Sequence, residues 1–154
     1  MKIKKRVGIG FLMVLIVTML VACGGKKEET TIYEKKQNGL ESIITYYHQG
    51  DKVLRQTTRN AIRYADFGIK NKEAAKAKLD SAVEQYKGVS GITHKITYNE
   101  NDMLEEMEVN FSKLDYEKAK TIPGFIINGD PKEGISLTKC HELLEKQNYK
   151  KVEK

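Results

Sequence analysis

The sequence predicts an α+β domain in which an antiparallel sheet, built from two β-hairpins, has its helices packed on one face. Two pairs of segments with strand-like residue patterns are each joined by a short polar turn, which is typical of hairpins. Two further segments space their apolar residues as one face of a helix does, and each follows one of the pairs. This order gives an α+β class, with a ββα duplication as a further hypothesis.

The first ββα unit is expected over residues 42–88. Residues 42–49 (SIITYYHQ) are rich in β-branched and aromatic side chains, Gly50 and Asp51 favour a turn, and residues 52–64 continue as a second strand. Asn71 is expected to cap the helix that follows, and Gly88 to end it. The apolar positions of this helix fall on one face: Ala75, Leu79, Ala82, Val83 and Tyr86.

The second unit begins with a clearer alternation. Ile92, His94, Ile96 and Tyr98 alternate with polar residues, so these four side chains are expected on the inner face of a strand. After the turn at 99–102, the same face continues in a set of apolar residues interrupted only by Glu105: Met103, Met107, Val109 and Phe111.

Two more helical segments are predicted by their capping residues. Asp115 can cap a short turn that ends before Pro123, and residues 128–134 are expected to form a loop. Ser136 can cap a final helix with Leu137, Cys140 and Leu144 on its apolar side. The short similarities between 44–54 and 96–104, and between 86–89 and 149–152, are compatible with duplication and equally with chance.

The N-terminus has the features of a bacterial export signal. Lys2, Lys4, Lys5 and Arg6 precede sixteen residues without a charge, from Val7 to Ala22. The next junction, residues 20–23 (LVAC), resembles the lipobox of bacterial lipoproteins, whose cysteine receives a diacylglycerol before cleavage. We therefore expect residues 1–22 to be a lipoprotein signal peptide, with an uncleaved anchor helix as the alternative.

The expected lipid on Cys23 would hold the mature chain on the extracytoplasmic side of the cell membrane, since two acyl chains suffice for stable anchoring. Residues 23–38 are rich in charge and poor in apolar side chains, which predicts a flexible tether. Residues 39–154 then remain for a single α+β domain.

Removal of the signal peptide changes the charge of the chain. The whole sequence has 27 Lys+Arg and 21 Asp+Glu, a net charge of +6, but four cations and no anion lie in residues 1–22. The mature chain would therefore carry 23 cations against 21 anions, a net charge of +2. Such a balance gives no support to nucleic acid as a partner.

The ionisable residues do not form a recognisable catalytic or metal-binding pattern. The three histidines lack helical metal-site spacing, so neither a metal site nor a cofactor is expected. Cys140 lies on an apolar helix face and is expected to be a buried, unreactive thiol. We expect a binding protein and no enzyme. An envelope hydrolase and a structural spacer are the alternatives, and His48, His94 and Glu105 are the groups that would reveal catalysis if they converged in a pocket.

One row of residues is a candidate binding surface. The predicted mature chain has only three arginines, Arg55, Arg59 and Arg63, and their even spacing places them with Thr57 on one face of a strand. Such a row suits an anionic polymer, lipid headgroups or an acidic protein, although a solvated surface is the simpler interpretation. Pairing with the strand that contains residues 105–108 would neutralise it.

Three stretches resemble the YehR-like family of small bacterial lipoproteins. They are residues 45–60 (TYYHQGDKVLRQTTRN), 72–98 (KEAAKAKLDSAVEQYKGVSGITHKITY) and 128–137 (NGDPKEGISL). The resemblance extends from Thr45 to the C-terminus and implies a lipid-anchored α+β domain. These motifs consist of turns, caps and core positions, so the resemblance implies no activity and no site residues.

Overall fold

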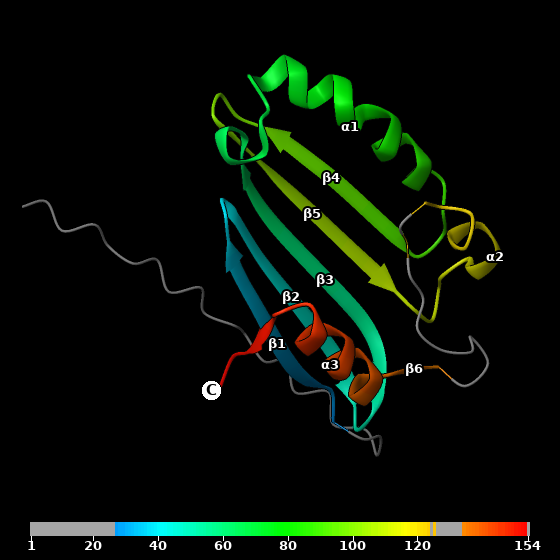
Figure 1. Cartoon of the computed structure of the whole chain (residues 1–154). Helices are drawn as coiled ribbons and strands as arrows, with labels where there is room; N and C mark the ends of the chain where they lie inside the picture. The colour runs from blue at the N-terminus through cyan, green and yellow to red at the C-terminus, as the bar shows by residue number, and fades with distance from the viewer. Residues whose placement is uncertain (1–26, 124, 126–133, 154) are drawn as a thin grey trace, which may run out of the picture.

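The computed structural model describes residues 27–123, 125 and 134–153. Its strands form one antiparallel sheet in the order β4-β5-β3-β2-β1-β7, with the short β6 paired to β3 (Figure 1). This arrangement of sheet and helices confirms the predicted α+β class. The elements are β1 (Glu29–Gln37), β2 (Leu40–Gln49), β3 (Lys52–Arg63), the 3-10 helix η1 (Tyr64–Phe67), α1 (Lys72–Tyr86), β4 (Ile92–Tyr98), β5 (Asp102–Asn110), α2 (Tyr116–Ala119), β6 (Ile135–Ser136), α3 (Leu137–Lys146) and β7 (Lys150–Lys151).

Both predicted hairpins are present. β2 and β3 pair across the turn at Gly50 and Asp51, and β4 pairs with β5 across residues 99–101. The hairpins join through their second strands, since β3 pairs with β5 over nine register positions from Arg55↔Asn110 to Arg63↔Asp102. The order β2-β3-β5-β4 is therefore symmetric about the β3–β5 boundary. Symmetry of this kind is what a duplication would produce, but the duplication itself stays a hypothesis.

The helices lie on one face of the sheet, as predicted. In β2 the buried side chains alternate with more exposed ones, and α3 packs on the buried set through Cys140 and Leu144. At the other side of the sheet, α1 packs on Met103 and its neighbours through Ala75. The strand register places both sets on the same side, which we call the covered face; the opposite side is the open face (Figure 1).

The predicted helix caps are confirmed. The side chain of Asn71 accepts a hydrogen bond from the backbone N–H of Ala74, and Asp115 and Ser136 do the same for the first turns of α2 and α3. On α1, Ala75 is fully buried, whereas Ala82, which was predicted on the same apolar face, is exposed. Helix α1 therefore contacts the sheet through a narrower stripe than the sequence indicated.

The prediction of a flexible tether through Asn38 is wrong for residues 29–37. They form β1, which pairs with β2 over nine register positions from Glu29↔His48 to Gln37↔Leu40. The reason is Tyr33, whose side chain is only 2% exposed and packs edge-on against Tyr46 with ring centroids 5.9 Å apart. One buried aromatic residue and a full ladder of backbone hydrogen bonds order a segment that its charge content made look unstructured.

Several predictions lie outside the described residues. They are the signal peptide, the lipidated Cys23 and most of the loop at 128–134. Among the helices in the described part of the chain, none combines the length and apolar character needed to span a membrane.

Candidate functional site

The open face of the sheet carries the predicted arginine row. On β3 the side chains that point to this face are those opposite to the covered set: Arg55, Thr57, Arg59, Ala61 and Arg63. Neither α1 nor α3 lies on this side. The prediction that the three arginines share an outward face with Thr57 is therefore confirmed.

The neighbouring strand supplies carboxylates to this row. On β5, Glu108, Glu106 and Asp102 alternate on the open face and lie opposite Thr57, Arg59 and Arg63. Arg55 Nη1 lies 3.2 Å from Oε2 of Glu108, and its guanidinium stacks 3.5 Å from the ring centroid of Tyr47. Arg63 Nε lies 2.6 Å from Oδ2 of Asp66. Two of the three arginines are thus already engaged, so the row does not offer a continuous surface to an extended anion.

Arg59 differs from the other two arginines. Its side chain is exposed and lies opposite Glu106, which lies opposite Lys95 on β4. In the described part of the chain, Arg59 takes part in no ion pair within 4.0 Å. Its guanidinium can therefore receive an external partner without first breaking an internal contact.

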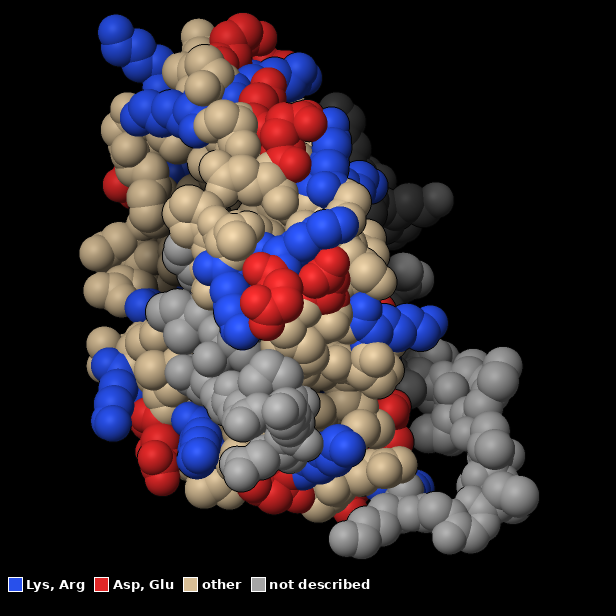
Figure 2. Space-filling model, turned by 90° about the vertical axis from the view of Figure 1, so that its right-hand side faces the viewer, with Lys and Arg blue, Asp and Glu red and all other residues tan. Residues whose placement is uncertain are grey.

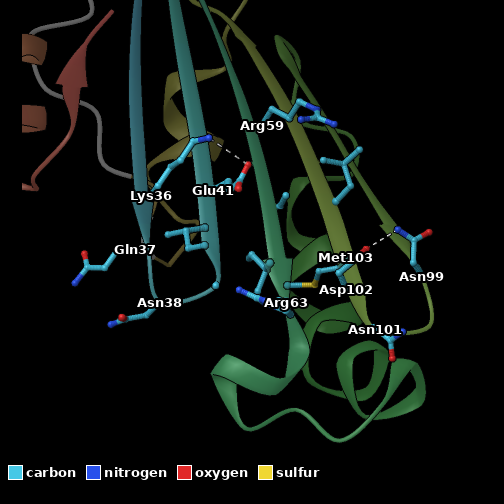
Figure 3. Close-up of a pocket in the computed structure, with 15 residues that line it drawn as sticks. Lys36, Gln37, Asn38, Glu41, Arg59, Arg63, Asn99, Asn101, Asp102 and Met103 are labelled. Carbon is cyan, nitrogen blue, oxygen red and sulfur yellow. Dashed lines mark hydrogen bonds and ion pairs between the residues drawn. The ribbon is translucent and has the colours of Figure 1, made fainter. Parts of the chain in front are cut away.

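A hollow of about 680 Å³ lies at the end of the open face where β3 meets two turns (Figure 3). Its wall is formed by the β1–β2 turn, the second half of β3 and the β4–β5 turn. Apolar Ala61 and Leu104 contribute to the lining, and side-chain amides are abundant around it: Gln37, Asn38, Asn99 and Asn101. Five charged residues line it as well: Lys36, Glu41, Arg59, Arg63 and Asp102.

The charged residues of the hollow are paired with one exception. Lys36 Nζ lies 3.8 Å from Oε2 of Glu41, and Asn99 donates a 2.7 Å hydrogen bond to Asp102. Because Arg63 contacts Asp66, Arg59 is the only charged residue of the lining without a described polar partner. The hollow therefore presents one available guanidinium among side-chain amides, two ion pairs and the carboxylate of Asp102, which accepts a hydrogen bond from a neutral amide.

Hydrogen bonds to the end of β3 hold the two turns in place. The Arg63 backbone N–H donates to the Gly39 carbonyl at 2.9 Å, which fixes the β1–β2 turn. The Tyr64 backbone N–H donates to the Asn101 carbonyl at 3.0 Å, and its hydroxyl donates to the Asn99 carbonyl at 3.1 Å, which fixes the β4–β5 turn. Because the Tyr64 side chain is buried, these contacts make the hollow a preformed feature of the fold.

The covered face carries a chain of hydrogen-bonded side chains, which we call the polar chain. His94 Nε2 lies 2.8 Å from Oε1 of Glu105, and Asn60 donates to Oε2 of the same carboxylate at 2.8 Å. Asn60 in turn accepts a 2.6 Å hydrogen bond from the Ser42 hydroxyl, which lies 2.8 Å from the hydroxyl of Tyr149. The polar chain thus crosses the sheet from β4 to the residue before β7.

The histidines occupy different environments. The His94 side chain is 3% exposed and its ring centroid lies 4.6 Å from that of Tyr86. Its Nδ1 is buried and has no hydrogen-bond partner among the described residues. His48 lies elsewhere on the covered face, where Nδ1 lies 2.8 Å from the Gly50 carbonyl oxygen and Nε2 lies 2.9 Å from the Thr31 hydroxyl. His94 and Glu105 therefore meet, and His48 does not join them.

Cys140 is buried in the core on the side of α3 that faces the sheet, as predicted, and burial raises the pKa of its thiol. A raised pKa lowers the fraction of thiolate, the form that reacts. Within residues 27–123, 125 and 134–153, no group of three or more His, Cys, Asp or Glu side chains is placed to hold a metal ion.

Several residues of these features were not singled out in the sequence. No sequence motif marks the polar-chain residues Ser42, Asn60 and Tyr149. Ser42 does lie on the same face of β2 as the core residues Ile44 and Tyr46, and this alternation predicts a polar side chain that points into the core. The amides of the hollow come from two turns far apart in the sequence. Only the pairing of β3 with both β2 and β5 brings these turns to the same end of the sheet.

Charges of both signs are interspersed over another side of the molecule as well. Figure 2 shows the side that lies at the right of Figure 1, where α1, α2 and β4 are found, with Lys and Arg mixed among Asp and Glu. No broad area of one sign is visible on this side. The view agrees with the mutual compensation found on the open face and differs from the surface expected for binding a polyanion.

Comparison with known proteins places this fold in a family. Over residues 29–150 the chain matches the family described as "Protein of unknown function (DUF1307)". The chain belongs to this family. An uncharacterized lipoprotein of Listeria monocytogenes is 41% identical over 152 residues, which is 99% of this chain and 98% of the relative. The uncharacterized lipoprotein YehR of Escherichia coli is 31% identical over 139 residues, 90% of each chain. The predicted resemblance to YehR-like proteins is confirmed.

Solved structures agree with this assignment. The NMR structure of the Escherichia coli YehR protein superposes with a TM-score of 0.69 at 31% identity, covering 83% of this chain and 93% of that one. An NMR structure of a Streptococcus pneumoniae protein gives a TM-score of 0.55 at 12% identity, covering 97% of this chain and 99% of the other. The second similarity concerns the fold alone.

Proposed function

We propose that this DUF1307 protein is a lipid-anchored module on the extracytoplasmic side of the cell membrane, where it binds a protein partner without catalysing a reaction. The anchor is the diacylglycerol on Cys23, after removal of residues 1–22. Support comes from the LVAC junction behind a charged and an apolar segment, and from relatives named lipoproteins that align over nearly the whole chain.

The anchor is tested by Cys23→Ser. The wild type should incorporate a radiolabelled fatty acid and sediment with membranes, whereas the variant should do neither. As a matched control, Cys140→Ser changes the other cysteine and should leave labelling unchanged. A wild type that incorporates no acyl chain contradicts the anchor.

The open face is the proposed binding surface, and its charge arrangement supports a protein as the partner. The arginine row of β3 lies beside the acidic row of β5, so an anionic polymer or a headgroup layer would meet carboxylates as well as arginines. A protein surface can present both signs in a complementary pattern. The observation that carries the proposal is this face of mixed charge, left open by α1 and α3, with a preformed hollow at one end.

Crosslinking and pull-down from intact envelopes test this proposal. A variant in which Arg55, Arg59 and Arg63 are all alanine should lose the captured partner, while the corresponding triple lysine variant should retain part of it, because charge remains without the planar fork. The control variant replaces Lys70, Lys78 and Lys146, three exposed cations away from the open face, with alanine. Equal capture by the wild type and the triple alanine variant contradicts a binding role of the open face.

An envelope hydrolase is the second candidate function, and the contact between His94 and Glu105 is the observation that favours it. The same contact is part of the polar chain, where Glu105 also accepts from Asn60, and the hollow lies on the opposite face of the sheet. These features support a structural role for the pair. Hydrolysis of an envelope substrate that is lost in His94→Gln, with the fold intact, would favour the enzyme.

A further inference from the structure

We propose that the hollow at the end of the open face binds a peptide segment that carries a carboxylate, with the guanidinium of Arg59 as its anchor. The proposal rests on the proposed binding function and specifies the chemistry of its ligand. Three properties of the hollow support it: an available guanidinium, a rim rich in amides, and walls that are fixed before a ligand arrives.

The charge that is available determines the kind of ligand. Among the five charged residues of the lining, Lys36 and Glu41 compensate each other, Arg63 contacts Asp66, and Asp102 accepts from Asn99. Only Arg59 lacks a described partner, so the hollow offers one planar, fork-shaped donor. A carboxylate fits this donor through two parallel hydrogen bonds. A ligand with many negative charges would be repelled by Glu41, Asp102 and the nearby Glu106.

The amides around the hollow determine the rest of the ligand. Gln37, Asn38, Asn99 and Asn101 each have a side-chain carbonyl and a side-chain NH₂, and a peptide backbone has the complementary pair of groups. Ala61 and Leu104 add a small apolar area where an aliphatic side chain can lie. The volume of about 680 Å³ lies within the range of about 300–1,000 Å³ that is usual for small-ligand sites.

The walls are preorganised. Gly39 and Asn38 have positive φ angles of 77° and 46°, which close the β1–β2 turn tightly, and the Gly39 carbonyl is held by Arg63. Tyr64 holds the other turn through Asn99 and Asn101. Because hydrogen bonds within the fold fix both turns, little conformational entropy is lost when a ligand binds.

Short peptides test the proposal on the full chain in detergent micelles, with binding followed by isothermal titration calorimetry. The first probe is acetyl-Ala-Ala-Ala with a free C-terminal carboxylate, and the second is acetyl-Ala-Glu-Ala-amide, which carries the carboxylate on a side chain. Acetyl-Ala-Ala-Ala-amide is the uncharged control. We expect saturable binding of at least one carboxylate peptide with a dissociation constant below about 10 mM, and the better of the two identifies the source of the carboxylate.

Variants locate the binding. Arg59→Gln should weaken binding of the carboxylate peptide about 10-fold or more, and Arg59→Lys should weaken it less, since a charged hydrogen bond remains without the fork. The matched control is Lys95→Gln, which removes a positive charge beside Glu106 on the same face but outside the hollow, and which should leave binding within about 2-fold.

Three results would overturn the proposal: no saturable binding of either carboxylate peptide, equal binding of the uncharged peptide, or unchanged binding by Arg59→Gln. These results differ from those expected if the proposed function itself were wrong. If a protein partner is captured from envelopes through the open face while the peptides do not bind, the binding function stands and the carboxylate anchor is wrong. If the arginine variants capture the partner as the wild type does, the open face is not the binding surface, and the proposed function fails on that point.

Discussion

The Nε2 atom of His94 lies 2.8 Å from Oε1 of Glu105, across the β4–β5 pair and on the covered face of the sheet. The His94 side chain is 3% exposed and that of Glu105 is 25% exposed, so the contact lies largely out of water. Glu105 interrupts an otherwise apolar strand face, and without partners it would be unfavourable there. Its two oxygens bind His94 and Asn60, which explains how the core accepts a carboxylate.

Removal of the Glu105 side chain should destabilise the protein. In Glu105→Ala, the groups on His94 and Asn60 that the carboxylate binds lose their partner, so we expect a loss of about 1–3 kcal/mol in the free energy of unfolding. Glu105→Gln keeps one acceptor oxygen and should fall between this variant and the wild type. Urea unfolding followed by circular dichroism measures the difference.

The adjacent residue provides the control for this prediction. Glu106 is also a glutamate on β5, but it is exposed on the open face, so Glu106→Ala should change the free energy of unfolding by no more than about 0.5 kcal/mol. Equal effects of the two alanine variants would mean that the polar chain contributes nothing to stability.

The hydrogen bonds that join Asp51 to the start of α3 should make the free energy of unfolding depend on pH. Hydrogen bonds from Ser136 and Thr138 lower the pKa of its carboxyl group. The folded pKa is therefore below the unfolded value of about 3.9, so the stabilisation is complete above that pH and is lost as the pH falls through the folded pKa. Asp51→Asn removes this titration. The stability advantage of the wild type over the variant should shrink between pH 6 and about pH 3 in urea titrations; a constant advantage contradicts the linkage.

Cys140 should react slowly with thiol reagents while the protein is folded. Its thiol is buried on the side of α3 that faces the sheet and burial raises its pKa, so both access and the thiolate fraction are low. In the Cys23→Ser variant, where Cys140 is the only cysteine, reaction with a disulfide reagent at pH 8 should be about 100-fold slower in buffer than in denaturing urea. Similar rates in the two solvents would show that the thiol is accessible in the folded state.

Much of the fold was predictable because its signals are local. The alternation in β4, the turn at Gly50 and the caps at Asn71 and Ser136 each depend on a few neighbouring residues, and all four are confirmed. β1 was missed for the opposite reason. Its order depends on β2 and on the core around Tyr33, neither of which contributes to the composition of the segment itself.

The candidate site was predictable only in part. Strand periodicity correctly predicts Arg55, Arg59 and Arg63 on one face, and pairing with the strand that contains residues 105–108 partly neutralises them, as the sequence indicates. Arg59 has no described ion-pair partner because the nearby carboxylates of Glu108 and Asp66 contact Arg55 and Arg63 instead. The hollow forms between two turns that the strand order brings to the same end of the sheet. Such relationships between distant segments require the sheet topology, which residue patterns along the chain do not specify.

The two glycines at hairpin turns, Gly39 and Gly50, allow a test of the hollow's wall. Both have a positive φ, 77° and 61°, so any side chain is strained at either position. A Cβ at Gly50 would meet nothing within 4 Å, whereas a Cβ at Gly39 would clash with the side chain of Asp66. Asp66 is the carboxylate that engages Arg63 beside the hollow, so a shift of its side chain would disturb this wall.

Gly39→Ala should therefore destabilise the protein more than Gly50→Ala does. The backbone strain at Gly50 is expected to lower the free energy of unfolding by about 1–2 kcal/mol, and the contact with Asp66 adds to a similar strain at Gly39. Gly39→Ala should also weaken binding of the carboxylate peptide, while Gly50→Ala, at the opposite end of β2, should not. Urea unfolding and calorimetry on both variants measure the two effects. Equal stability and equal peptide binding in the two variants would show that the packing of Asp66 on Gly39 shapes neither the fold nor the hollow.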